Sequence, residues 1–161
     1  MIERTLVLLK PDALQRGLVG RIINRLEDAG CKIVGCQMRL VDDDLARRHY
    51  SNLEQRVGAD VFATVIRYMR SGPIIALAIE ADGAVATVRK LVGATFPSQA
   101  APGTIRGDWC HQGGRAAGDP RAVFNLVHAS GSPDEAAAEL SLWFGPDQTF
   151  AYTRADEAFT V

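Results

Sequence analysis

His128 is the residue of this sequence with the clearest capacity for chemistry, because an apolar run gives way there to a helix. Ser132 can cap that helix, Pro133 suits its first position, and Glu135 completes a capping box. Anions bind readily at such corners, and a neutral histidine is a nucleophile. Glu139, on the same helix, could orient the ring. Taken alone, however, a single histidine more often packs at a strand end than catalyses, so the rest of the chain decides.

Other candidate site residues stand at the ends of predicted elements. Each also has a purely structural interpretation: Lys10 could be solvated, Tyr50 could cover the core, and Arg89 could be one more surface charge. Singly, none of them indicates a function. The whole set comprises Lys10, Tyr50, Arg89, Thr95, Arg106, Asn125 and His128.

Common nucleotide and metal signatures do not account for these residues. The chain contains no GxxxxGK[ST] and no strand-linked GxGxxG. Cys110 and His111, with Cys31 and Cys36, lack the short gaps that zinc sites use within each ligand pair. The cysteines are better interpreted as small hydrophobic core residues.

The composition indicates an ordinary globular protein, with 47% hydrophobic residues, 23% charged residues and a net charge of −1. The length of 161 residues predicts a single domain over 1–161. The charge gives no general attraction to nucleic acid or to an anionic membrane, and no apolar run is long enough to span a bilayer. The three cysteines have no disulfide-framework spacing and the N-terminus has no signal-peptide layout, which favours the cytoplasm.

Hydrophobic periodicity predicts the elements that position the candidate residues. Strands are predicted over 6–9, 32–41, 74–79 and 122–127, and the first ends at Lys10 because Pro11 cannot continue a central strand. Helices are predicted over 18–30, from Asp42 or Asp43 through Tyr50, over 60–70, over 85–93 and from Pro133 onward. Residues 94–121 form a long irregular stretch, and loops of that length usually carry function.

This order, β-α-β-(αα)-β-α-β-α, predicts an α/β (α+β) fold. It matches a ferredoxin-like split βαβ sandwich, in which a four-stranded antiparallel sheet is covered by helices, with an added helical hairpin.

Taken together, these residues make the chain similar to the nucleoside diphosphate kinase family along nearly its whole length. The similar stretches are ERTLVLLKPDALQRGLVG at 3–20, HY at 49–50, YMRSGP at 68–73, PGTIRGDW at 102–109, NLVHASGS at 125–132 and LWF at 142–144. PGTIRGD together with NxxH at a strand-to-helix corner is a highly specific combination.

The resemblance implies a ping-pong reaction in which the terminal phosphoryl group of a nucleoside triphosphate passes to His128 and then to a different nucleoside diphosphate. Glu139 matches the family's carboxylate that hydrogen-bonds the far ring nitrogen, and Ser130 matches the serine that supports this carboxylate. Tyr50 would shape the site near the histidine. Phosphoryl transfer needs an in-line nucleophile surrounded by positive groups, which agrees with these residue types.

The resemblance also implies how the nucleotide is held. Lys10 would contact the transferring phosphate and the sugar 3′-hydroxyl, and Asn125 would bind the sugar hydroxyl. Arg89, Thr95 and Arg106 would hold the phosphates, since arginine suits bidentate pairing. Mg²⁺ would bridge the phosphates without a dedicated set of protein ligands. The expected partners are nucleoside di- and triphosphates and further copies of the chain, as a hexamer or a tetramer.

Three departures from the family pattern are visible. Gly131 stands where the family has an aspartate that is thought to reach the magnesium ion through water. About nine extra residues, AAGDPRAVF at 116–124, separate Gly114-Arg115 from Asn125, so either Arg115 or Arg121 could replace the family arginine. Their apolar end and Asp-Pro turn suggest a loop that affects assembly more than chemistry.

The third departure concerns the nucleotide base, which the family stacks between an aromatic and an aliphatic side chain. The spacing puts Val61 at the aromatic position, Phe62 beside it, and Val65 at the aliphatic position. Val61 and Val65 share a helix face, whereas Phe62 is turned by about 100°. We therefore expect either a Val61–Val65 slot or a shifted helix that brings Phe62 to the base.

A second hypothesis is a catalytically inactive nucleotide-binding regulatory module on the same fold, because a fold does not fix a function. The oriented nucleophile favours the enzyme, since simple binding needs no such group.

Overall fold

The computed structural model describes residues 1–110 and 124–160. Arg115, Arg121 and the insertion up to residue 123 lie outside the described residues, as does His111. The predictions made for them therefore stay predictions.

Four strands form one antiparallel sheet in the order β2-β3-β1-β4. They are β1 (Ile2–Leu9), β2 (Lys32–Arg39), β3 (Ile74–Asp82) and β4 (Val127–Ala129). The strands β1 and β3 are apolar along most of their length because both faces of the sheet are covered. The predicted four-stranded antiparallel sheet with its covering helices is confirmed.

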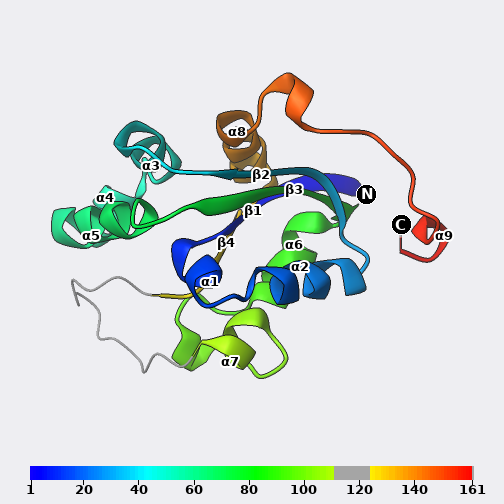
Figure 1. Cartoon of the computed structure of the whole chain (residues 1–161), viewed down its shortest axis with the longest axis horizontal. Coiled ribbons are helices and arrows are strands. Elements are labelled where there is room, and N and C mark those ends of the chain that lie inside the picture. Colours follow the sequence, from blue (N-terminus) through cyan, green and yellow to red (C-terminus); the bar gives the residue numbers. More distant parts are fainter. Residues whose placement is uncertain (111–123, 161) are drawn as a thin grey trace.

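The helices form two layers, one on each face of the sheet (Figure 1). One layer contains α2 (Val19–Asp28), α6 (Ala84–Val92) and α7 (Ile105–Trp109), which pack on Val7 and Leu9. The other contains α3 (Asp43–His49), α5 (Ala59–Met69) and α8 (Pro133–Trp143), which pack on Leu6 and Leu8. The alternation of β1 therefore sends successive side chains into two separate cores.

Shorter helices complete the described chain. They are α1 (Pro11–Gln15), α4 (Leu53–Val57), α9 (Glu157–Thr160) and the 3₁₀ turns Pro97–Gln99 and Pro146–Gln148. Helices α3, α4 and α5 make up the predicted helical hairpin. None of the helices in the described part of the chain has the length and apolar character that crossing a membrane requires.

Three local predictions need correction. The stretch 94–121, predicted to be irregular, contains α7, which the side chain of Thr104 caps by accepting from Gly107 N–H. Residues 124–126, predicted to belong to a strand over 122–127, precede β4, which spans 127–129, because Leu126 has a φ of 65°, which no strand residue adopts; residues 122 and 123 lie outside the described residues. Cys31 and Cys110 are buried as expected, but Cys36 is exposed.

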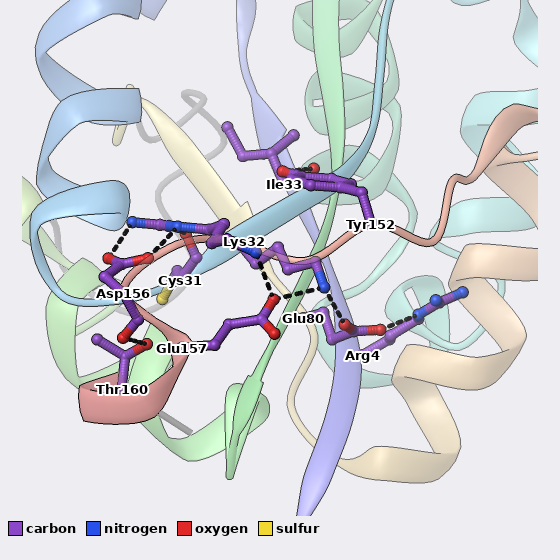
Figure 2. Close-up of polar contacts among 10 residues, drawn as sticks. Arg4, Cys31, Lys32, Ile33, Glu80, Tyr152, Asp156, Glu157 and Thr160 are labelled. Carbon is purple, nitrogen blue, oxygen red and sulfur yellow. Dashed lines mark hydrogen bonds and ion pairs between the residues drawn. The ribbon is translucent and has the colours of Figure 1, made fainter.

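The segment after α8 returns along the outer edge of β2 (Figure 1). Phe150 N–H donates to Val34 O at 2.7 Å, and Tyr152 Oη donates to Ile33 O at 2.8 Å. Figure 2 shows Lys32 between two carboxylates, with its Nζ 2.8 Å from Glu157 and 3.2 Å from Glu80. These contacts cover the first half of an edge strand whose backbone groups would otherwise lack partners.

Candidate active site

His128 lies at the centre of a polar cluster formed by β4, β1 and α8. It pairs with Leu8 of β1, and its side chain is 15% exposed. Its Nε2 lies 2.9 Å and 3.0 Å from the two carboxylate oxygens of Glu139, in the second turn of α8. Ser130 Oγ donates to Glu139 Oε2 at 2.6 Å and accepts from Leu6 N–H at 3.3 Å. The structure thus brings His128, Glu139 and Ser130 together, as the sequence predicts.

This geometry fixes the tautomer of His128. A carboxylate only accepts, so Nε2 carries the proton and Nδ1 keeps a free lone pair. Burial, followed by the positive charge of Lys10, lowers the pKa of His128 to about 3. The ring is therefore neutral and nucleophilic throughout the physiological pH range.

His49, at the end of α3, is a site residue that the sequence interpretation missed. Its ring centroid is 4.5 Å from that of His128. Its Nδ1 accepts from Trp143 Nε1 at 3.2 Å and lies 3.5 Å from Glu139 Oε1. Its fully buried side chain leaves Nε2 without a hydrogen-bond partner among the described residues. The HY pair at 49–50 contained the signal, but only Tyr50 was given a role.

The cluster of His49, His128 and Glu139 also has the composition of a metal site, with potential ligand atoms within 4.8 Å of one another. The hydrogen bonds argue against that interpretation. The Nδ1 lone pair of His49 is used by Trp143, and both Glu139 oxygens accept from His128. The cluster is accounted for as a hydrogen-bond network around a neutral histidine.

Lys10 and Asn125 form the second part of the site. Lys10 Nζ donates to Asn125 Oδ1 at 2.8 Å, and Asn125 Nδ2 donates to Thr95 O at 2.8 Å. Burial, followed by repulsion from Arg106, lowers the pKa of Lys10 to about 7. The ammonium group is thus held close to the point at which it loses its charge.

Arg106 is only 7% exposed and ties three backbone segments together. Its guanidinium donates to Gly93 O at 2.9 Å, to Asn125 O at 3.2 Å and to Val127 O. Burial lowers its pKa to about 10, so it remains positively charged at neutral pH. The sequence predicted a phosphate ligand, and the structure adds a scaffold role that occupies three of its five N–H donors.

Leu126, between Asn125 and Val127, is the only non-glycine residue of the described chain with a positive φ. Val127 N–H donates to Asn125 O at 2.7 Å, which closes a γ-turn around Leu126. Such a turn costs on the order of 1–3 kcal/mol and persists only where its surroundings hold it. It lies between the side chains of Asn125 and His128 and sets their relative direction.

Arg89 and Thr95 are exposed, on α6 and just after it. Arg89 Nη1 lies 3.7 Å from the place that a Cβ on Gly131 would take. Glu135 Oε2 lies 2.6 Å from that place and accepts from Gly131 N–H, so Glu135 fills the space beside the glycine. The expected capping box is therefore only half formed: Ser132 Oγ accepts from Glu135 N–H, while the Glu135 carboxylate turns to Gly131.

The structure separates the residues proposed to bind the base. Phe62 is 5% exposed and is on the face of α5 that packs into the core, so no helix shift has moved it out. Val61 and Val65 are half-buried, which favours the Val61–Val65 slot over the alternative. Tyr50 has its ring centroid 6.1 Å from that of His128, and burial raises the pKa of its hydroxyl, which therefore stays protonated.

Comparison with known proteins points to one family. The family model for nucleoside diphosphate kinase matches residues 3–149. A nucleoside diphosphate kinase of Pyrococcus furiosus is 45% identical over 158 residues, covering 98% of this chain and 92% of that protein. One of Archaeoglobus fulgidus is 44% identical over 156 residues, covering 97% and 95% of the two chains.

Solved structures agree in fold. A transition-state mimic of the Borrelia burgdorferi nucleoside diphosphate kinase, with bound vanadate and ADP, has a TM-score of 0.93 at 34% identity and covers 98% of this chain and 95% of that one. The Halobacterium salinarum enzyme in complex with CDP has a TM-score of 0.84 at 38% identity, covering 98% and 97%. The chain therefore belongs to the nucleoside diphosphate kinase family, whose enzymes transfer phosphate between nucleotides.

Proposed function

We propose that this protein transfers the terminal phosphoryl group of a nucleoside triphosphate to Nδ1 of His128, and from there to a nucleoside diphosphate. The observation that carries the proposal is the hydrogen bond from His128 Nε2 to Glu139, which leaves Nδ1 as the nucleophile. A module that only binds nucleotides would not need this orientation.

In the first half-reaction, Nδ1 attacks the terminal phosphorus, and a P–N bond forms as the P–O bond to the diphosphate breaks. The electron pair of that bond leaves on the diphosphate oxygen. The ring becomes positively charged while its proton stays on Nε2, where the Glu139 carboxylate stabilises the charge. The second half-reaction reverses these steps with a different diphosphate.

The charged groups around His128 suit the phosphates. Lys10 and Asn125 lie together at one end of the γ-turn, where they would bind the transferring phosphate and the sugar hydroxyl. Arg89 and Thr95 are exposed and would hold the other phosphates with the free N–H donors of Arg106. Their positive charges oppose the charge that spreads over the phosphoryl oxygens in the transition state.

Magnesium is the divalent ion that we propose, held through the substrate phosphates. The exposed surface beside His128 suits a hard cation, because the carboxylate of Glu135 lies there, close enough for its charge to act on His128. Glu135 would hold the ion through water. When bound, the ion would neutralise phosphate charge.

We further propose that residues 1–161 act as one domain in a cytoplasmic homo-oligomer, a hexamer or a tetramer. Support comes from the family and from Met38 and Leu40, which are 63% and 71% exposed at the end of edge strand β2. Light scattering would give the assembly mass.

The proposed reaction is tested with γ-labelled ATP, without a diphosphate acceptor. We expect one labelled phosphate per chain, stable in base and labile in acid, on His128. Adding a nucleoside diphosphate should discharge the label into the corresponding triphosphate. Nucleotide binding without any labelled protein would instead support the inactive module.

The pH dependence of kcat/KM should reflect Lys10. Its folded pKa is about 7, so the ammonium is charged below that pH and loses its charge as pH rises through it. We expect kcat/KM to fall by up to about tenfold per pH unit above this value, since that parameter reports the free enzyme. A Lys10→Arg variant, whose charge persists above pH 7, should not show this fall in kcat/KM. If the fall is unchanged in the variant, a group other than Lys10 causes it.

Val61 and Phe62 should have different roles, one in binding the base and one in stability. Val61→Ala should raise KM severalfold at constant kcat, because stacking contacts are made equally in the ground and transition states. Phe62→Ala should instead lower the free energy of unfolding by about 3–5 kcal/mol, as expected for a buried phenylalanine. Steady-state kinetics with several diphosphates and urea unfolding separate the two. A purine KM that rises only in Phe62→Ala would contradict the aliphatic slot.

A further inference from the structure

We propose that Asp12 and Tyr68 are positioning residues of this site: together they hold the γ-turn at Leu126 that sets Lys10 and Asn125 against each other. The inference rests on the proposed function, because it concerns the same site. It assigns a role to two buried residues that no step of the reaction uses.

Both peptide groups of Leu126 are tied to the corner between β1 and α1. Leu126 O accepts from Lys10 N–H at 2.8 Å, and Leu126 N–H donates to Asp12 Oδ2 at 3.1 Å. Leu126 is fully buried and Asp12 is 6% exposed, so water cannot replace the carboxylate. Since Pro11 has no N–H, the residues on either side of it supply both contacts.

Tyr68, near the end of α5, holds the carboxylate in place. Its hydroxyl donates to Asp12 Oδ1, and the residue is 6% exposed. The same ring packs edge-to-face on Phe124, with centroids 5.0 Å apart, and lies 5.6 Å from Lys10 Nζ. Tyr68 therefore contacts Asp12, Phe124 and Lys10. We call Asp12 and Tyr68 together the clamp.

The clamp affects the reacting groups because it holds the turn that joins them. Asn125 precedes Leu126, and Val127, which follows it, begins the strand that carries His128. Without Asp12, the N–H of Leu126 would be buried and unpaired, and only the hydrogen bond from Lys10 N–H to Leu126 O would still tie this residue to the corner between β1 and α1. The backbone would then relax toward an ordinary φ, which would turn the Asn125 side chain away from Lys10.

Three variants test the clamp: Asp12→Ala, Asp12→Asn and Tyr68→Phe. Asparagine can still accept from Leu126 N–H and donate to the tyrosine oxygen, so it removes the charge but keeps both contacts. Each variant is phosphorylated under single-turnover conditions at saturating ATP, well below its unfolding temperature. The dissociation constant of a fluorescent ADP analogue is measured in parallel.

We expect Asp12→Ala to slow phosphorylation by on the order of tenfold, because small misplacements of reacting groups have effects of this size. Tyr68→Phe should slow it less, Asp12→Asn should stay close to wild type, and nucleotide affinity should change by less than about threefold, as for loss of transition-state contacts. A merely structural role would lower the unfolding temperature and leave the saturated rate unchanged.

Several results would overturn the proposal. One is an unchanged phosphorylation rate in a folded Asp12→Ala variant. Another is an Asp12→Asn variant that is as slow as Asp12→Ala, because the slowing would then come from the lost negative charge near Lys10 and not from the lost contacts. If Asp12→Ala does not fold, a wild-type rate in Tyr68→Phe decides against the clamp. Failure of the wild type to become phosphorylated would refute the proposed function instead, so the two failures are distinguishable.

Discussion

The His128→Ala variant is expected to form no phosphoenzyme and to lose nucleoside diphosphate kinase activity by several orders of magnitude, as deletion of a covalent nucleophile commonly does. Nucleotide should still bind, because the hydrogen bonds that hold the side chains of Lys10 and Asn125 do not involve the imidazole ring. The measurement combines γ-labelled ATP, coupled turnover and a fluorescent ADP analogue.

A His49→Asn variant is the control for this experiment, because the ring of His49 packs against that of His128. Burial lowers its pKa to about 3, so it is neutral like His128. However, its Nδ1 accepts from Trp143 Nε1–H, which leaves Nε2 protonated and no free lone pair. His49→Asn should therefore still become labelled on His128. Label recovered from His49 in the wild type would refute the assignment of the nucleophile.

Glu139→Gln should keep the fold and slow phosphorylation by about ten- to a hundredfold, as loss of an orienting partner often does. The carboxylate accepts from both His128 and Ser130, whereas an amide offers one oxygen and would place an NH₂ group against one of these donors. It would also no longer stabilise the positive charge on the phosphorylated ring.

The matched control is Asp134→Asn, an exposed carboxylate of the same helix. It should phosphorylate at the wild-type rate. Ser130→Ala, which removes the serine donor to Glu139 Oε2, should give a phosphorylation rate between those of Glu139→Gln and Asp134→Asn. A wild-type single-turnover rate in Glu139→Gln would show that the carboxylate does not act through His128.

Local signals in the sequence were sufficient for the ends of two helices that carry site residues. Ser132 and Pro133 begin α8 as predicted, and Gly93 ends α6 with a φ of 86°. These features depend on residues within about one turn, so the sequence contains all that determines them. The fold followed from the order of these elements, and the candidate residues followed from the family motifs.

What only the tertiary structure decided depends on contacts between distant residues. His49 meets His128 because α3 and α8 cover the same face of the sheet. Arg106 turns to three backbone carbonyls because burial leaves it few other acceptors.

The turn at Leu126 is the clearest case of a feature that the local sequence does not determine. The run AVFNLV at 122–127 reads as a strand, since a buried leucine there satisfies the apolar pattern in either conformation. Its left-handed backbone is held by Lys10 and Asp12, more than a hundred residues away along the chain. A local pattern records that a side chain is buried, but not which distant hydrogen bonds hold its backbone in a strained conformation.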